Sequence, residues 1–239
     1  MSLFKKLFTG ATGYWIHKKS TLPVGTDIFV DIHERLHCKP FKVVFDVGAN
    51  IGQTWEWVRA NEPSSKIYCF EPVSGPFAEL KKLVGNDSNT VLEHLALGEA
   101  KGQKTIRLFD ENSSLNSLKD DVMNNTGYSK EEIVTIDTLD SYCKKNNISK
   151  IDFLKIDTEG YELNVLEGAG EMLSSESISF IYCETGFLRQ NNRNTYFADL
   201  TEWLEARGYH FFGIYQLVSN GWRKDFGNAL FVPKSVAKR

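Results

Sequence analysis

Short apolar runs that end at or beside an acidic residue recur along the chain. Residues 43–47, 67–70, 151–156 and 178–183 are rich in β-branched and aromatic side chains, and none of these runs is long enough for a helix. Such runs are typical of strands buried on both faces of a parallel sheet. Residues 74–84 and 196–207 instead place apolar side chains at helical spacing. The pattern therefore predicts an α/β fold with one doubly wound sheet.

The first apolar run breaks into a turn of small residues. Gly48, Asn50 and Gly52 lie in this turn, and both residue types tolerate positive φ, while glycine also lets the backbone approach a ligand closely. The second run ends at Glu71, about 20 residues beyond the turn, where strand–turn–helix nucleotide folds hold a ribose by its hydroxyls. These features predict a nucleotide-binding unit.

The charge of this unit indicates which nucleotide it accepts. A dinucleotide brings an anionic pyrophosphate to the turn, and Asp46 at the mouth of the first strand would repel it in a low-dielectric site. S-adenosylmethionine carries a sulfonium and an ammonium group against one carboxylate, so acidic residues suit it. Asp46, Gly48, Asn50, Gly52 and Glu71 together resemble the cofactor motif of class I methyltransferases. The alternative is that Asp46 only caps the following helix and that Glu71 ends a strand by chance.

Four predicted strands finish in acids, namely Asp46, Glu71, Asp157 and Glu184. Open parallel sheets bind ligands outside the carboxyl ends of their strands, so we expect these acids to line one crevice. Strand alternation places Lys155 on the same face as Asp157. A lysine in a buried strand requires a charged partner, and Asp157 and Asp46 are the two candidates.

The acids at the end of the fourth strand allow three interpretations. In the first, Asp157 is the general base that takes a proton from the methyl acceptor, and Lys155 holds or tunes it. In the second, Asp157, Glu159 and Glu184 bind a divalent cation that polarises the acceptor group, because hard oxygen ligands suit Mg²⁺. In the third, acids in the first turn of a helix only favour its dipole, which explains Glu159 but not Lys155.

Two polar segments are candidates for recognising a substrate. Residues 184–194 follow the fifth strand, and Glu184, Arg189 and Arg193 are the candidate substrate-binding residues there. The alternative is that this segment is only a solvated loop. Residues 110–125 form a second polar stretch, which either orders on binding or is mobile.

The N-terminal region differs from the rest of the 239-residue chain. Ile28, Ile32 and Leu36 recur at helical spacing, and Asp27 is a plausible cap for that helix. We therefore expect a helical extension over residues 1–40 and one catalytic domain over residues 41–239. The extension is interpreted as a lid, as a weak membrane-surface contact or as plain packing against the domain.

Bulk composition excludes several classes of protein. The formal net charge is −3, so no basic excess marks a nucleic-acid-binding protein. The sequence has no apolar stretch near the ~20 residues that cross a bilayer, and the N-terminus lacks the apolar core of a secretion signal. The four cysteines are scattered without metal-type spacing, which is typical of reduced thiols. These features predict a cytoplasmic protein.

From about residue 22 to residue 233 the chain resembles the FkbM family of S-adenosylmethionine-dependent methyltransferases. The segments that carry the resemblance are 45–52, 70–72, 96–98, 138–140, 152–162, 166–169, 183–184 and 228–232. The most specific is Lys-Ile-Asp-Thr-Glu-Gly-Tyr-Glu at 155–162. The resemblance implies a Rossmann-like class I sheet of seven strands in the order 3-2-1-4-5-7-6, with the seventh strand antiparallel.

The resemblance also implies roles for the cofactor residues. Gly48, Asn50 and Gly52 cradle the methionine part of S-adenosylmethionine, Asp46 lies beneath it, and Glu71 takes the ribose. Pro72 completes the second motif, and Ala96 and Leu97 lie where methyltransferases touch the adenine ring.

The activity that the resemblance implies is O-methylation of a hydroxyl on a sugar, glycan or natural product. N-methylation of an amine and a non-catalytic S-adenosylmethionine-binding module are the alternatives. A nucleotide-dependent oxidoreductase is disfavoured, because Asp46 is present and the dinucleotide glycine pattern is missing. The sequence leaves the acceptor and the oligomeric state open.

Overall fold

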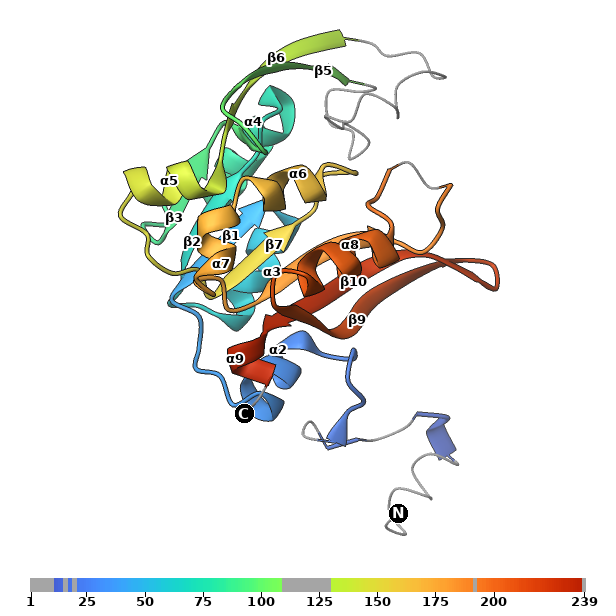
Figure 1. Ribbon diagram of the computed structural model, residues 1–239. Coiled ribbons are helices and arrows are strands. Elements are labelled where there is room, and N and C mark those ends of the chain that lie inside the picture. The colour runs from blue at the N-terminus through green and yellow to red at the C-terminus, as the bar shows by residue number, and fades with distance from the viewer. Residues whose placement is uncertain (1–10, 15–16, 19–20, 109–129, 191–192, 238–239) are drawn as a thin grey trace. The chain divides into compact units, whose positions relative to one another are not determined.

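The computed structural model describes residues 11–14, 17–18, 21–108, 130–190 and 193–237 (Figure 1). Backbone contacts divide the chain into two compact units, Met1–Lys39 and Pro40–Arg239. The polar stretch 110–125 lies outside the described residues. Of the described helices, none combines the length and the apolar character that crossing a membrane demands.

The first unit contains the helix that the spacing of Ile28 and Ile32 predicts. Helix α2 (Ile28–Val30) continues into a π-helical turn, η2 (Asp31–Arg35). The side chain of Asp27 accepts hydrogen bonds from the backbone N–H groups of Phe29 and Val30. The predicted helix and its cap are therefore confirmed.

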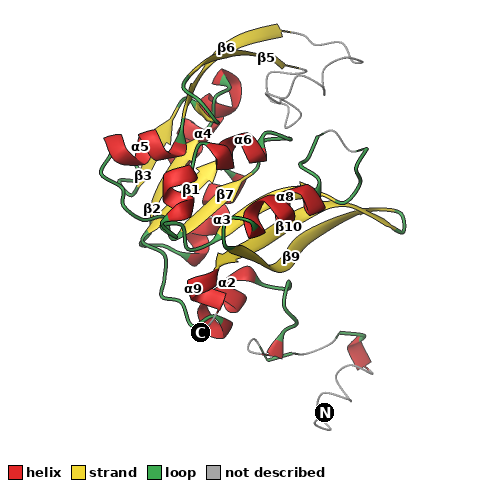
Figure 2. Cartoon of the chain, in the orientation of Figure 1, coloured by secondary structure: helices red, strands yellow, loops and turns green. Residues whose placement is uncertain are grey.

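The second unit is built around a seven-stranded sheet (Figure 2). Its strands are β1 (Val43–Val47), β2 (Lys66–Phe70), β3 (Thr90–Glu93), β7 (Phe153–Ile156), β8 (Ile181–Gly186), β9 (Tyr209–Asn220) and β10 (Arg223–Pro233). The spatial order is β3-β2-β1-β7-β8-β10-β9, and only the pairings of β10 are antiparallel. Counted within this sheet alone, the order is 3-2-1-4-5-7-6, which confirms the predicted class I topology.

Helices pack on both faces of this sheet. They are α3 (Gln53–Asn61), α4 (Ser74–Val84), α5 (Leu139–Lys145), α6 (Glu162–Glu167), α7 (Gly170–Ser174), α8 (Phe197–Glu205) and α9 (Lys234–Ala237). Tyr142 of α5 makes edge-on ring contacts with Phe45 and Phe70. Trp57 of α3 contacts Phe153 and Tyr182, which the strand register places on the opposite face. Asp46 and Lys155 share this second face with Tyr182, because they are Cα partners in the sheet.

A separate three-stranded sheet lies beside the main one. It consists of β4 (Ala96–Leu97), β5 (Gly102–Leu108) and β6 (Lys130–Asp137), in the order β4-β6-β5. Ala96 and Leu97 of β4 pair with Ile136 and Asp137 of β6. This pairing joins segments that are about 40 residues apart, which local patterns do not encode.

Candidate functional site

The glycine turn between β1 and α3 closes against two neighbouring strands. Gly48 and Asn50 have positive φ angles of 82° and 49°. The N–H groups of Gly48 and Ala49 both donate to the carbonyl of Phe70 at the end of β2. A side chain at position 48 would collide with the backbone carbonyl of Asp157, so only glycine fits here. The turn forms one wall of a cavity of about 610 Å³.

Asp46 lies fully buried just before this turn. Neither of its carboxylate oxygens has a hydrogen-bond partner among the described residues, and the side-chain oxygen of Asn50 is also buried without one. Burial is the main cause that raises the pKa of Asp46 to about 7. Lys155 opposes this shift, whereas Asp157 and Glu71 add to it. Buried polar atoms without partners are uncommon in folded proteins, so this position fits a ligand that supplies positive charge or N–H donors.

Glu71 is held by the backbone of the same turn. Its two carboxylate oxygens accept from the N–H of Asn50 at 2.9 Å and from the N–H of Val73 at 2.8 Å. Burial raises the pKa of Glu71 to about 7, although these two hydrogen bonds act in the opposite direction. The cavity lining includes Gly48, Asn50, Glu71, Pro72, Ala96 and Leu97. The structure thus brings six of the eight predicted cofactor residues to one cavity, with Asp46 buried directly before the turn.

Gly52 is the predicted cofactor residue that lies elsewhere. It does not line the cavity, and its φ is 104°. A Cβ atom at this position would lie 2.5 Å from Cδ2 of Leu83 and 3.0 Å from Cδ1 of Leu80. Gly52 therefore allows α3 to begin against α4, which is a packing role.

The charged side chain of Lys155 is buried against the sheet. Its side chain is 4% exposed, and its Nζ donates to Oδ2 of Asp157 at 3.0 Å. The Nζ also lies 5.7 Å from the centre of the Tyr182 ring. Burial lowers the pKa of Lys155, but the carboxylates of Asp157 and Glu184 more than offset this, and the pKa lies above its usual value. The contact confirms Asp157 as the partner that strand alternation suggested.

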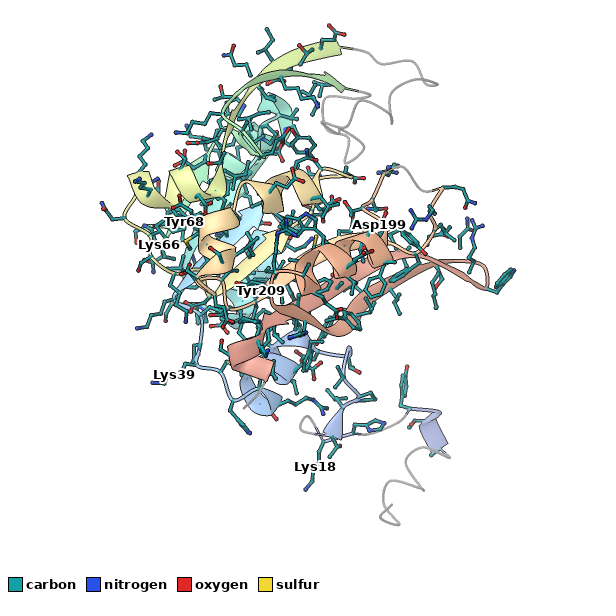
Figure 3. The ribbon with its side chains drawn as sticks, viewed as in Figure 1. Lys18, Lys39, Lys66, Tyr68, Asp199 and Tyr209 are labelled. Carbon is teal, nitrogen blue, oxygen red and sulfur yellow. The ribbon has the colours of Figure 1, made fainter. Side chains whose placement is uncertain are left out.

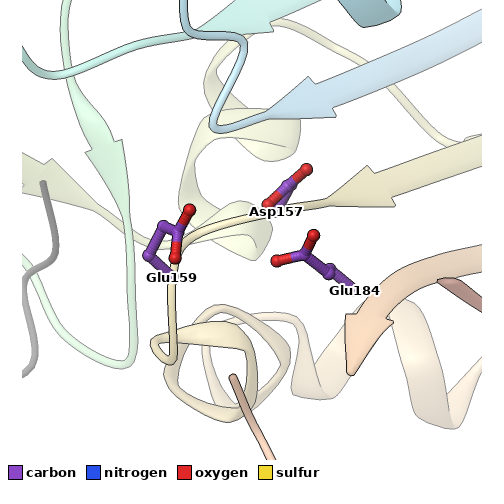
Figure 4. A group of neighbouring side chains, drawn as sticks. All are labelled: Asp157, Glu159 and Glu184. Carbon is purple, nitrogen blue, oxygen red and sulfur yellow. The ribbon is translucent and has the colours of Figure 1, made fainter. Parts of the chain in front are cut away.

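Three carboxylates meet at the ends of β7 and β8 (Figure 4). One oxygen from each of Asp157, Glu159 and Glu184 lies within 4.8 Å of the other two. Burial and then the charge of Asp157 raise the pKa of Glu184 to about 9. Burial raises that of Glu159 to about 7, against the effect of Arg193. We call these three residues the acid cluster.

A short loop before α8 holds the acid cluster in place. Residues 193–195 each bind a different glutamate: Arg193 donates to Glu159 at 2.9 Å, Asn194 to Glu184 at 2.5 Å and Thr195 to Glu162 at 2.6 Å. Glu162 is fully buried and also accepts from the N–H groups of Thr158 and Gly160. It ties the loop that carries Glu159 to the loop that carries Asn194. Its position in the first turn of a helix does not reveal this role.

The candidate substrate residues separate into two groups. Glu184 and Arg193 line the cavity beside Asp157 and Glu159. Arg189 does not: its guanidinium pairs with Asp199 at 2.9 Å and lies 4.4 Å from the centre of the Tyr196 ring. Asp199 belongs to α8 (Figure 3). Arg189 is thus engaged in a surface contact.

One wall of the cavity comes from residues that the sequence analysis did not select. Tyr182, Gln216, Val218, Phe226 and Asn228 line it from β8, β9 and β10. The hydroxyl of Tyr182 and the amide of Asn228 both donate to the side-chain oxygen of Gln216. Tyr182, Val218 and Phe226 lie in strands whose apolar pattern indicates only packing. Asn228 lies in the segment 228–232 that carries the family resemblance, but nothing in that segment assigns it to a site.

Comparison with known proteins places this geometry in a family. The chain matches the Methyltransferase FkbM domain over residues 46–211. It is 24% identical over 157 residues to 2-O-methyltransferase NoeI of Sinorhizobium fredii, which covers 61% of this chain and 64% of NoeI. It is also 24% identical over 192 residues to 31-O-demethyl-FK506 methyltransferase FkbM of Streptomyces tacrolimicus, covering 68% of this chain and 74% of that protein. The chain thus spans less than two thirds of the length of NoeI.

Among solved structures, magnesium protoporphyrin IX methyltransferase (ChlM) of Synechocystis PCC 6803, with bound SAM, aligns with a TM-score of 0.48 and 9% identity. The alignment covers 86% of this chain and 75% of ChlM. The domain match extends from Asp46 at the glycine turn through β8 and α8 and so includes the acid cluster. The chain belongs to the FkbM family of methyltransferases.

Proposed function

We propose that this protein transfers a methyl group from S-adenosylmethionine to a hydroxyl group. The observation that carries the proposal is Asp46, a buried carboxylate beside the glycine turn whose oxygens have no hydrogen-bond partner in the described part of the chain. S-adenosylmethionine supplies an electrophilic methyl group on a positively charged sulfur. Asp46 and Asn50 would hold its charged amino-acid end, Glu71 its ribose, and Ala96 and Leu97 its adenine. These residues fit a cationic ligand and would repel a pyrophosphate.

Two observations favour a hydroxyl group as the methyl acceptor. Both curated relatives are named as O-methyltransferases or by an O-linked position. Asp157 and Glu184 line the cavity in which the cofactor residues gather, so a carboxylate lies close to where a hydroxyl would react. A sugar, a glycan and a natural product remain the acceptor classes, and N-methylation is the alternative.

Asp157 is the proposed general base, and Lys155 is the residue that positions it. Both residues line the cavity, but the Asp157 side chain is partly exposed, whereas that of Lys155 is buried. A general base must come within hydrogen-bond reach of the proton that it takes, and Asp157 is the acid that the buried lysine fixes in orientation. The alternative is a divalent cation such as Mg²⁺ on the acid cluster, which the 4.8 Å grouping of its oxygens favours. Lys155 and Arg193 already neutralise two of these three acids, which weakens that alternative.

Calorimetry separates this proposal from a dinucleotide-binding function. We expect S-adenosylhomocysteine to bind the full chain with a dissociation constant in the micromolar range, equivalent to about −8 kcal/mol. At pH 8, above the pKa of about 7 of both Asp46 and Glu71, we expect NAD to give no measurable heat, because its pyrophosphate would lie near these two carboxylates. Binding of NAD without binding of S-adenosylhomocysteine would exclude the proposed function.

The variant Gly52→Ala tests whether Gly52 supports packing or the cofactor. The added methyl group meets Leu83, and the φ of 104° strains any other residue. We expect unfolding free energy to fall by about 1–3 kcal/mol, while the affinity of the folded protein for S-adenosylhomocysteine stays within about threefold. Urea unfolding and calorimetry measure the two quantities. Adding Leu83→Ala should restore part of the stability; unchanged stability with lost binding would instead assign Gly52 to the cofactor.

A further inference from the structure

A second cavity of about 440 Å³ adjoins the first at the acid cluster. The two cavities share Glu159, Glu184, Arg193 and Phe226. The remaining residues that line the second cavity are Leu188, Gln190, Asn194, Arg223 and Asp225. A molecule in the second cavity would therefore contact two residues of the acid cluster, Glu159 and Glu184, in a space that none of the predicted cofactor residues lines.

The charges along the second cavity are balanced in pairs. Arg193 lies 2.9 Å from Glu159, and Arg223 lies 3.3 Å from Asp225. Each arginine in the described part of this lining thus has a carboxylate within ion-pair distance, and Glu184 adds a further acid. A phosphate or carboxylate on a ligand would find both arginines already paired and would lie beside the charge of Asp225. Like charges at such close range disfavour binding.

The uncharged groups of the lining define what does fit. Leu188 and Phe226 offer apolar surface, and the side-chain amides of Gln190 and Asn194 lie in the same wall. A ring that carries hydroxyls on its edge and C–H bonds on its faces matches this combination, because an aromatic side chain packs against C–H faces while amides and carboxylates bind hydroxyls. Phe226 lies where β10 leaves β8, since pairing between these strands begins at Phe226 and Gly186.

We propose that the second cavity is the acceptor subsite and that it selects an uncharged, hydroxyl-bearing ring, with the Arg223–Asp225 pair acting as the determinant that rejects anionic acceptors. The inference rests on the proposed methyl transfer. It narrows the acceptor to neutral rings, a chemistry that a neutral sugar unit shares with a hydroxylated alicyclic ring. Removal of the Asp225 charge leaves the positive charge of Arg223 without this partner, so the preference for neutral over anionic acceptors should decrease.

The test measures binding of matched neutral and anionic probes to the full chain saturated with S-adenosylhomocysteine. The neutral probes are the methyl glycosides of glucose and galactose and trans-1,2-cyclohexanediol; the anionic probes are the corresponding methyl glucuronoside and galacturonoside. We expect the wild type to bind at least one neutral probe, and the uronides about tenfold more weakly or not at all. Binding of the diol alone would indicate an alicyclic acceptor, and binding of a glycoside a sugar. Saturation-transfer NMR titrations provide the dissociation constants.

Three variants test whether the second cavity causes the preference for neutral over anionic probes. Asp225→Asn should improve uronide binding about tenfold relative to the neutral probes. Asp199→Asn is the matched control, because it frees Arg189 in the same way but outside the cavity, and it should leave the ratio unchanged. Phe226→Ala should weaken all ring probes by about tenfold.

The outcomes distinguish this inference from the proposed function. Failure of S-adenosylhomocysteine to bind would overturn the methyltransferase proposal itself. With that ligand bound, wild-type protein that binds uronides as tightly as glycosides, or that binds no neutral probe, would overturn the acceptor inference alone. An equal change in Asp199→Asn and Asp225→Asn would also contradict it.

Discussion

Replacing Asp46 by asparagine is expected to abolish S-adenosylmethionine binding and, at pH 8, to make the ligand-free protein more stable. Asp46 is fully buried, and its two oxygens lack partners among the described residues. The ionised carboxylate is costly in this place unless a cation lies beside it. Loss of the charge should weaken the cofactor by at least about 100-fold, equivalent to about 2.7 kcal/mol.

The stability effect depends on pH. The pKa of Asp46 rises, mainly through burial, from 3.8 to about 7, so between these values the native protein holds a proton that the unfolded chain has lost. A native state that binds more protons than the unfolded chain loses stability as pH rises. The contribution of Asp46 to the unfolding free energy therefore falls between about pH 4 and pH 7 and stays low above pH 7. At about 1.4 kcal/mol per pKa unit, ionised Asp46 costs on the order of 4 kcal/mol at pH 8. Asparagine should recover about 1–3 kcal/mol, because its buried amide also lacks partners.

Urea unfolding at pH 5 and pH 8 measures this difference, and calorimetry measures cofactor binding. At pH 5 Asp46 costs only about 1.6 kcal/mol, because the native state keeps its proton and pH 5 lies little above the unfolded pKa of 3.8. The buried amide of Asp46→Asn has a similar cost, so the two proteins should have nearly equal unfolding free energies. Asp199→Asn is a suitable control, because Asp199 pairs with Arg189 on the surface. A variant that binds S-adenosylmethionine normally, or that is less stable than wild type at pH 8, would show that Asp46 has partners we have not identified.

The second large effect is expected at Asp157. Asp157→Asn keeps the shape of the side chain beside Lys155 but removes the carboxylate that we propose as the general base. A positioned base contributes about 10²–10⁴-fold to such reactions, so kcat should fall by that factor. The affinity for S-adenosylhomocysteine should stay within about threefold, because the proposed function assigns cofactor binding to Asp46 and Glu71 and not to Asp157. The rate at which the tritiated methyl group of S-adenosylmethionine is transferred to a glycoside that binds the protein provides kcat.

Metal chelation separates the base from the cation alternative at the acid cluster. If Asp157 acts as a base, EDTA should leave wild-type turnover unchanged, and added Mg²⁺ should not rescue Asp157→Asn. Loss of wild-type activity in EDTA, with recovery on adding Mg²⁺, would instead assign Asp157, Glu159 and Glu184 to a bound cation. Unchanged kcat in Asp157→Asn without any metal effect would exclude both roles.

Local sequence patterns were sufficient to predict those site residues that lie in a single strand or in the turn that follows it. Strand alternation alone predicted that Lys155 and Asp157 share a face, and their 3.0 Å contact follows from that covalent proximity. The turn at Gly48 and the acid at Glu71 were likewise predicted from spacing, and the structure joins them through the N–H of Asn50. Such contacts depend on backbone geometry that short segments carry with them.

The amino-acid sequence by itself determined the doubly wound sheet, the glycine turn and the acids at the strand ends, because apolar periodicity and chain direction place these without reference to distant residues. Only the tertiary structure decided that Gly52 packs against Leu83, that Arg189 pairs with Asp199 outside the cavity, and that residues 193–195 hold three glutamates. These outcomes depend on which side chains meet across segments far apart in the chain. A residue type and its spacing do not specify that choice, since each such side chain has several chemically suitable partners.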